Sequence, residues 1–455
     1  MGWISKLFDS VSERGREIWQ QESRDDKTSS GSLADACRNL LSRQGDAVAL
    51  AIAKEILQRY QHASNDEKLS FFHFLQTLQP DFNQISQLSH ACAELKSPQS
   101  YQELCTAFSG GRKDLFELLN VPGLGTASLV SLREDLLKAM RTHPDLKVVD
   151  VDLQSTLQSW FNRGFLEFRS ITWETPAYIL EKLIEYEAVH EIQDWDELKR
   201  RLEVDRDCFA FFHPALPGEP LIFVQVAYTR GISGDVSPFL NKDTPIEEAD
   251  AADSAIFYSI SNCQKGLKGI SFGNFLIKQV VQEILQKRPT IQQFSTLSPM
   301  PALTLALSRG LIDEEALVTI GGKKTALLKQ QYDVDSLTEL LTEKAGLLEH
   351  NDDQTTAWLE EVGLYYLAQI KKGSEPFDPV ARFHLSNGAS IYRINPFANT
   401  RPYGLKSSAG LMVNYIYELD QVEINHEHFK QNGTIAIHRL NNKKNKIKRI
   451  ENVCA

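Results

Sequence analysis

The first third of the chain repeats apolar residues at the spacing of an amphipathic helix. The pattern is clear in five segments, at residues 33–44, 47–61, 66–78, 82–96 and 126–143. Apolar positions three and four residues apart fall on one face of a helix and predict packing between helices. No group of His, Asp, Glu or Cys stands at metal-ligand spacing here. The segment is therefore predicted to be a helical bundle that acts as a scaffold or an oligomer interface.

The pattern changes near residue 165, where strand-like alternation begins in "FLEFRSITW". A helix is predicted at 176–189, two strands joined by a Pro-Gly turn at 208–229, and a further strand in "AIFYSIS". A glycine-rich turn, a helix over 274–287 and the strand "IQQFSTLSPMP" follow. Strands alternating with helices in this way indicate an α/β domain around a mixed sheet.

Helical spacing returns at about 314–372, and strand-like runs follow in "ASIYRIN", "LMVNYIYEL" and "GTIAIHRL". The expected architecture is thus a helical N-terminal domain, 1–165, followed by a mixed-sheet α/β domain, 166–455, with a helical insertion at about 314–372. The 455 residues are ample for two such domains.

Net charge and cysteine spacing narrow the classes of function. The formal net charge of −11 argues against a nucleic-acid partner. Six scattered cysteines without CxxC spacing, the lack of a long apolar run and the lack of a secretory signal favour a reducing, cytoplasmic setting without membrane insertion.

The stretch "QKGLKGISFGNFLIK" places Gly266, Gly269 and Gly273 between a strand and a helix. Such a turn can present free backbone N–H groups and the positive end of a helix dipole to a phosphate. Lys265, Lys268 and Lys278 add positive charge. The alternative is an ordinary turn, because the spacing is neither GxGxxG nor a P-loop.

Two further positions are candidates for chemistry. Ser298 precedes Pro299 at the end of a predicted strand, where it either meets a ligand or only forms a turn. His384, in "FHLSNGAS", is an acid–base candidate or a structural histidine. His426 and His428 alternate as strand residues do, and no third ligand at useful spacing accompanies them, so no metal site is predicted.

Several blocks together resemble the malonyl-CoA decarboxylase family. They are "LQSWFNRGFLEFRSITWETPAYILEKLIEYEAVH", "HPALPGEPLIFVQVAYT", "AIFYSISNCQKGLKGISFGNFLIK", "FSTLSPMP", "FHLSNGASIYRIN" and "GLMVNYIY", which occur in the family's order. The resemblance is strong over residues 153–417. It implies a helical domain used in oligomerisation, joined to a catalytic domain similar to N-acetyltransferases (GNAT-like).

The resemblance also implies site residues. The segment "KGISFGN" matches the malonyl-CoA-binding segment, made of Lys268, Gly269, Ile270, Ser271, Phe272, Gly273 and Asn274. Ser298 and His384 match the catalytic pair, and Tyr417 matches a tyrosine that lines the site. Some family members carry glutamate where Ser271 stands, so the group that positions the histidine would differ here.

The implied activity is that of a carboxy-lyase, which converts malonyl-CoA to acetyl-CoA and CO2 without a metal or an organic cofactor. The coenzyme A thioester would be the substrate, and the protein would form a dimer or tetramer through its helical domain. Two alternatives stay open: an acyl-CoA-dependent N-acetyltransferase of the same fold, and a non-catalytic acyl-CoA-binding scaffold.

Overall fold

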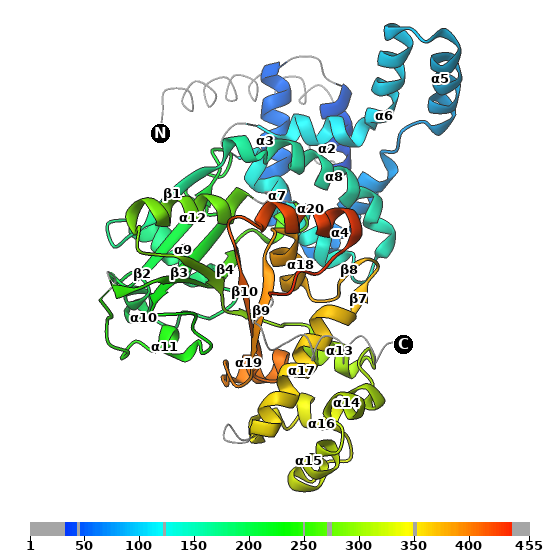
Figure 1. Cartoon of the computed structure of the whole chain (residues 1–455). Helices are drawn as coiled ribbons and strands as arrows, with labels where there is room; N and C mark the ends of the chain where they lie inside the picture. The colour runs from blue at the N-terminus through cyan, green and yellow to red at the C-terminus, as the bar shows by residue number, and fades with distance from the viewer. Residues whose placement is uncertain are drawn as a thin grey trace. The chain divides into compact units, whose positions relative to one another are not determined.

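The structure is a computed structural model of the chain, and it describes residues 32–42, 46–121, 124–248, 251–270, 275–348 and 353–438 (Figure 1). The chain divides into two compact units. One unit comprises Met1–Glu167 with the short segments Phe212–Leu221 and Gln264–Phe272, and the other comprises Phe168–Phe211, Ile222–Cys263 and Gly273–Ala455. The glycine-rich turn therefore folds with the helical unit, although it lies in the strand-rich part of the sequence.

The helical unit contains the helices that the apolar spacing predicts. Its longer helices are α2 (Leu33–Ser42), α3 (Asp46–His62), α4 (Asn65–Thr77), α5 (Phe82–Leu95), α6 (Pro98–Leu119), α7 (Gly125–Ala139) and α8 (Lys147–Trp160). Helix α4 begins after an N-cap serine, Ser64. The Ser64 hydroxyl accepts the backbone N–H of Glu67, and the Glu67 carboxylate accepts the backbone N–H of Ser64. This capping box satisfies backbone groups that a helix end leaves free.

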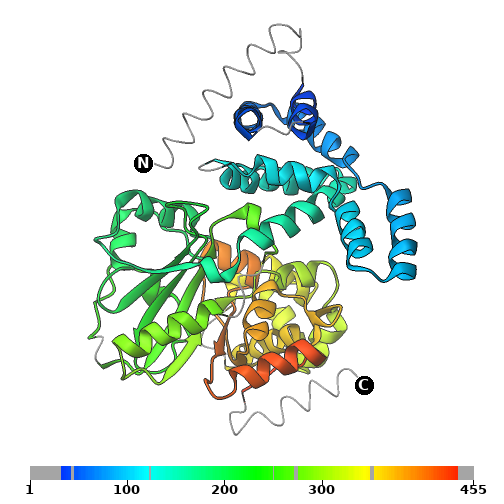
Figure 2. The ribbon, with the colours of Figure 1, turned by 90° about the horizontal axis from the view of Figure 1, so that it is seen from above.

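Helices α5 and α6 form a hairpin at one end of this unit (Figures 1 and 2). Helix α5 buries none of its residues. Phe82 and Leu95 are 66% and 68% exposed, and on α6 Tyr101 and Phe108 are also exposed. An exposed apolar surface of this kind is typical of an interaction site rather than of an ordinary solvent face.

The second unit is built on a mixed eight-stranded sheet. The strand order is β1 (Glu167–Ile171), β2 (Arg206–Phe212), β3 (Ile222–Thr229), β4 (Ser254–Asn262), β5 (Gln293–Thr296), β10 (Met412–Ile416) and β6 (Ser298–Pro299), and β9 (Ser390–Asn395) also pairs with β10. Strands β2 and β3 form the expected antiparallel hairpin, whereas β4 and β5 are parallel. Parallel neighbours need a crossover, which α12 (Phe275–Lys287) supplies between them.

Short helices complete this unit. They are α9 (Ala177–Tyr186), α10 (Trp195–Arg200), α11 (Ser237–Leu240), α18 (Pro379–Ser386), α19 (Pro402–Ser408) and α20 (Val422–Asn432). The helical insertion predicted at about 314–372 corresponds to α14 (Glu314–Gly321), α15 (Lys324–Tyr332), α16 (Leu337–Thr342) and α17 (Asp353–Gln369). A short helix that was not predicted, α13 (Leu303–Ser308), precedes it, and the hairpin of β7 (Lys371–Lys372) and β8 (Glu375–Pro376) follows it. The expected architecture, helices followed by a mixed-sheet α/β domain, is confirmed.

Two local predictions are wrong. His426 and His428 lie on helix α20, not on a strand, so a spacing of two puts their side chains on different faces. Of the predicted last strand, "GTIAIHRL", the described residues form only an isolated bridge between Ile391 and Ile437. In both places short apolar alternation was ambiguous, and tertiary packing decided the conformation.

No helix among the described residues is both long and apolar enough to cross a membrane.

Candidate active site

The structure brings Ser298, His384 and Tyr417 into one hydrogen-bonded chain. The Ser298 Oγ lies 3.0 Å from the His384 Nε2, and the His384 Nδ1 lies 2.9 Å from the Tyr417 hydroxyl. Their exposed fractions are only 6%, 2% and 4%. Three residues far apart in the sequence thus meet in a nearly dry environment.

Strand pairing sets the positions of the serine and the tyrosine. Val413 of β10 pairs with Ser298 of β6, and Ile416 pairs with Ser295 of β5. The backbone N–H of Tyr417 donates to the carbonyl of Phe294 at 2.8 Å. Because both residues are held by β10, the register of this strand determines how far apart their side chains stand.

Helix α18 presents the histidine from its last turn. The Asp378 carboxylate caps the helix by accepting the backbone N–H groups of Val380 and Ala381. The turn after the helix uses Gly388 at φ +85°, where a Cβ would lie 2.0 Å from the carbonyl oxygen of Val422. Only glycine fits this position, so the end of α18 is fixed by packing against the start of α20.

Thr296 and Tyr415 complete the surroundings of the pair, and the sequence reading missed both. The Ser298 hydroxyl donates to the Thr296 Oγ1 at 3.0 Å. The Tyr415 ring stacks on the His384 imidazole with centroids 4.7 Å apart and an interplanar angle of 27°. Each lies two residues before a predicted site residue on a strand-like run, and the period of two could have identified them.

Burial keeps this group of side chains uncharged. Removal from water lowers the pKa of His384 to about 3 and raises the pKa of Tyr417 well above its ordinary value. At neutral pH the imidazole and the phenol are both in their neutral forms. The histidine is therefore a neutral hydrogen-bonding group in the resting protein and not an imidazolium.

Asp378 is a second buried group behind the histidine helix. Its carboxyl accepts the Tyr366 hydroxyl at 2.9 Å in addition to its capping bonds. Burial raises the pKa of Asp378, although these donors act in the opposite direction. The capping geometry explains its place in the fold without a role in chemistry.

The glycine-rich turn, described within the helical unit, is held by two side chains of that unit. The buried Arg133 guanidinium donates to the carbonyls of Gly266 and Lys268 at 2.7 and 2.8 Å and pairs with Asp150 at 2.9 Å. The Gln154 amide donates to the carbonyl of Gly269 at 3.0 Å. The carbonyls of Gly266, Lys268 and Gly269 are therefore held in place by side chains of the helical unit.

The glycines of this turn have different reasons to be glycine. At Gly266 a Cβ would lie 1.9 Å from the carbonyl oxygen of Val130, so this residue serves close packing against α7. Gly269 is exposed at φ +80°, a conformation that side chains rarely adopt. Gly266 and Gly269 therefore have different roles in the turn. Gly273 lies outside the described residues.

The other predicted residues of the malonyl-CoA-binding segment are only partly described. Lys268 and Gly269 are exposed, whereas Ile270 is buried. Ser271, Phe272, Gly273 and Asn274 lie outside the described residues. Lys278 on α12 forms an ion pair with Glu423. Its charge is therefore already partnered.

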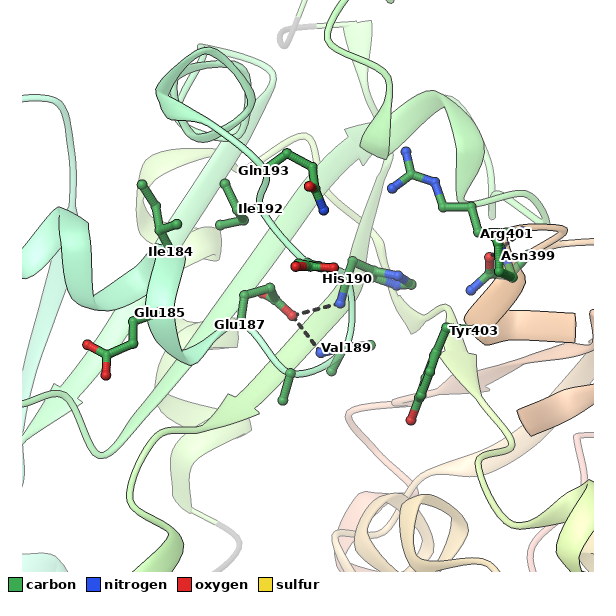
Figure 3. Close-up of a pocket in the computed structure, with 13 residues that line it drawn as sticks. Ile184, Glu185, Glu187, Val189, His190, Ile192, Gln193, Asn399, Arg401 and Tyr403 are labelled. Atoms are coloured by element: carbon green, nitrogen blue, oxygen red, sulfur yellow. Dashed lines mark hydrogen bonds between the residues drawn. The ribbon is translucent and has the colours of Figure 1, made fainter. Parts of the chain in front are cut away.

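A cavity of about 720 Å³ lies elsewhere in the second unit, between residues 184–193 and 399–403 (Figure 3). Its wall includes the buried His190 and the side chains of Arg401 and Tyr403. Glu187 also lies on this wall, but its carboxylate accepts the backbone N–H groups of Val189 and His190, drawn as dashed lines in Figure 3. None of the predicted site residues lines this cavity.

Two family models match the chain. The malonyl-CoA decarboxylase C-terminal domain matches residues 164–452, and the malonyl-CoA decarboxylase N-terminal domain matches residues 78–161. The chain is 36% identical over 331 residues to the goose (Anser anser anser) protein "Malonyl-CoA decarboxylase, mitochondrial". That alignment covers 68% of this chain and 64% of the goose protein, so it spans a little under two thirds of that relative.

Two solved structures are similar over most of both chains. One is the malonyl-CoA decarboxylase from Rhodopseudomonas palustris, with 41% identity, a TM-score of 0.80, and coverage of 89% of this chain and 97% of that chain. The other is the malonyl-CoA decarboxylase from Agrobacterium vitis, with 39% identity, a TM-score of 0.75 and the same coverage. Since both the sequence models and the fold agree from the helical unit through the sheet, this chain belongs to the malonyl-CoA decarboxylase family.

Proposed function

We propose that this protein is a carboxy-lyase that converts malonyl-CoA to acetyl-CoA and CO2. The observation that carries the proposal is the buried, uncharged chain of Ser298, His384 and Tyr417. The family resemblance implies Ser298 and His384 as the catalytic pair and Tyr417 as a residue that lines the site. A dry group of hydrogen-bond donors suits a reaction in which negative charge develops on an enolate oxygen.

The chemistry needs little beyond such donors. When the bond to the carboxylate breaks, its electron pair moves into the thioester, which becomes an enolate, and CO2 leaves. The carbon then takes a proton. The thioester itself accepts the electrons, so we propose that no metal or organic cofactor takes part. Donors that bind the enolate more strongly than the thioester accelerate the step.

We assign His384 as the polarising group and proton donor, with Ser298 in contact with the malonyl group and in the proton relay. Tyr417 holds the Nδ1 side of the imidazole at 2.9 Å. Both ring nitrogens of His384 already have hydrogen-bond partners, Ser298 and Tyr417. The neutral imidazole therefore donates to a developing oxyanion when that oxyanion replaces the Ser298 oxygen at Nε2. The low pKa of about 3 supports the polarising role, because the ring stays neutral at neutral pH.

The test of the function is release of CO2 from malonyl-CoA by the purified protein with no acyl acceptor present. Acetyl-CoA should appear in equal amount. An N-acetyltransferase would release free coenzyme A only when an amine is added, and a scaffold would bind acyl-CoA without consuming it. Either outcome would contradict the proposed activity.

We propose that the glycine-rich turn binds the phosphates of coenzyme A through Lys268–Asn274. The exposed Lys268 and Gly269 and the side chains that brace the turn support this. Positive charge and exposed backbone at one turn are the features that phosphate recognition uses. We also propose a domain boundary at about residue 165. The glycine-rich turn belongs by sequence to the domain after this boundary, but it folds with the helical unit.

The role of Gly269 gives a prediction for coenzyme A affinity. Gly269→Ala is expected to raise the Kd of coenzyme A about tenfold, a change of about 1.4 kcal/mol, because a methyl group would stand where the phosphate approaches. Calorimetric titration measures this. Gly310→Ala is the control for backbone strain, because Gly310 also has a positive φ, +67°, but lies outside the turn. The two sites differ in one respect: a Cβ at Gly269 would stand 3.1 Å from the Gln154 Nε2, whereas a Cβ at Gly310 would meet nothing within 4 Å. If both substitutions raised the Kd of coenzyme A equally, the effect at Gly269 would come from backbone strain alone and not from contact with the phosphate.

We also propose that the protein is a homo-oligomer assembled through the α5–α6 hairpin, with malonyl-CoA and acetyl-CoA as its small-molecule partners. The exposed Phe82, Leu95, Tyr101 and Phe108 support this surface. Leu95→Glu is expected to reduce the mass measured by light scattering after size exclusion. Leu327→Glu is the control, because Leu327 is 64% exposed on α15. A wild-type protein that is monomeric at micromolar concentration would contradict the proposal.

The cytoplasm is the compartment we propose. Four of the cysteines among the described residues, Cys37, Cys92, Cys105 and Cys208, are free thiols, which suits a reducing setting.

A further inference from the structure

The Ser298 hydroxyl has one proton and two close acceptors. The Thr296 Oγ1 and the His384 Nε2 each lie 3.0 Å from the Ser298 Oγ. A hydroxyl can donate to only one of them at a time. The direction of this single bond therefore decides which nitrogen of the imidazole carries the ring proton.

The geometry directs the serine proton to the threonine. Ser298 is aligned to donate to the Thr296 Oγ1, which also accepts the backbone N–H of Tyr415 at 3.2 Å. Thr296 is fully buried, with an exposed fraction of 0%. Its hydroxyl is thus held by β10 and stands ready as the acceptor for Ser298.

With its proton engaged, Ser298 can meet His384 only as an acceptor. The contact at 3.0 Å is then a hydrogen bond in which Nε2–H of the imidazole donates to the Ser298 Oγ. Nδ1 carries no proton and accepts the Tyr417 hydroxyl at 2.9 Å. In this arrangement Tyr417 donates to Nδ1, Nε2–H donates to Ser298, and Ser298 donates to Thr296, so each of these three protons is used once.

We infer that Thr296 is a positioning residue that holds the Ser298 proton and thereby keeps His384 in the Nε2–H tautomer. The inference concerns the resting protein, and its consequence for turnover rests on the proposed function. A serine that donates to the histidine would be activated as a nucleophile. Here the hydrogen bond has the opposite direction: Nε2–H of His384 donates to the Ser298 Oγ.

The direct test is the tautomer of His384 in the full-length protein labelled with ¹⁵N-histidine. The chain has 11 histidines, so the His384 signals are identified by their loss in His384→Asn. We expect a protonated Nε2 and an unprotonated Nδ1 in the wild-type spectrum at neutral pH. An Nδ1–H tautomer in the wild-type protein would overturn the inference without any variant or assay of turnover.

The variants test whether Thr296 is the cause. In Thr296→Val the Ser298 proton loses its acceptor and should turn to Nε2, so the ring proton should move to Nδ1. Thr296→Ser keeps the hydroxyl and should keep the wild-type tautomer. Ser295→Ala is the matched control, because Ser295 is a buried hydroxyl on the same strand. Its two possible acceptors are backbone carbonyls, those of Tyr415 and Thr296, and not the Ser298 chain. An unchanged tautomer in folded Thr296→Val would refute the role of Thr296.

Turnover provides the second readout. If decarboxylation uses the Nε2 proton, Thr296→Val should lower kcat by roughly a hundredfold, the usual effect of losing one such donor, with a smaller change in KM. Thr296→Ser should restore most of kcat. A wild-type protein that has the Nε2–H tautomer yet releases no CO2 would overturn the proposed function and leave the inference standing. If Thr296→Val changed the tautomer of His384 but kept the wild-type kcat, decarboxylation would not depend on the Nε2 proton, and the proposed consequence for turnover would be refuted.

Discussion

Substitution of His384 by asparagine is expected to lower kcat for malonyl-CoA decarboxylation by about a thousandfold, with a much smaller change in KM. Asparagine keeps approximate size and a donor but cannot exchange a proton in the way imidazole does, and a positioned acid–base group contributes about 10² to 10⁴ in rate. Steady-state kinetics with CO2 detection measure this. A near-wild-type kcat would remove His384 from the chemistry.

His190→Asn is the matched control for this substitution. His190 is also buried, and burial lowers its pKa to about 3 as well, but it lies on the cavity wall and not in the Ser298 chain. We expect His190→Asn to leave kcat nearly unchanged at a temperature where the variant is folded. An equal loss of kcat in both variants would point to damage to the fold.

The low pKa of both histidines also predicts how stability depends on pH. An unfolded histidine takes up a proton near pH 6.5, whereas the folded His384 does so only near pH 3. Between these values the unfolded state binds more protons, so the free energy of unfolding falls as the pH falls from about 6.5 to 3. Each of the two asparagine variants should take up as much as one proton fewer on unfolding, so its free energy of unfolding should depend less steeply on pH. Urea unfolding across that pH range measures this. Only His384→Asn should also lower kcat.

Ser298→Ala is expected to lower kcat by about a hundredfold or more, which corresponds to about 3 kcal/mol of transition-state stabilisation. The substitution removes the group that bridges His384 and Thr296 but little volume, so the site should keep its shape. If Ser298 only stabilised the turn before Pro299, the melting temperature would fall while kcat stayed near the wild-type value. Kinetics and a melting curve on the same variant distinguish these outcomes.

Ser254→Ala provides the control for loss of a buried hydroxyl. Ser254 is fully buried at the start of β4, and its hydroxyl donates to the Asp253 carboxylate at 2.7 Å. It should change stability and not kcat. A Ser298→Ala protein as active as Ser254→Ala would show that the catalytic pair is assigned wrongly.

Local pattern was enough to predict most of the elements. Apolar residues at helical spacing identified helices α2, α3, α4, α5 and α7 of the first unit but not α6 and α8. A Pro-Gly turn between strand-like runs identified the β2–β3 hairpin. These signals depend on residues a few positions apart, which is the range over which helix and strand periodicity acts. Where the apolar run was short, as at His426 and His428, the same signal failed.

Local context made Ser298 and His384 separate candidates, and only the family resemblance joined them as a catalytic pair. Nothing local requires them to meet, because 86 positions separate them. Their contact depends on the pairing of Val413 with Ser298 and on the packing of Gly388, at the end of α18, against Val422, which are long-range features of the fold. Such contacts form only when distant segments dock.

The sequence by itself thus determined the order of helices and strands and the residue types available for chemistry. The tertiary structure decided which of these residues pack in the core, which stay exposed and which become neighbours. It assigned Gly266 to packing against Val130 and left Gly269 exposed, and it placed Thr296 and Tyr415 beside the catalytic candidates. It also removed the imidazole of His384 from water. The physical reason is that periodicity is a local property of the chain, whereas burial, strand register and hydrogen-bond direction arise from residues that are distant in sequence and become neighbours only in the folded protein.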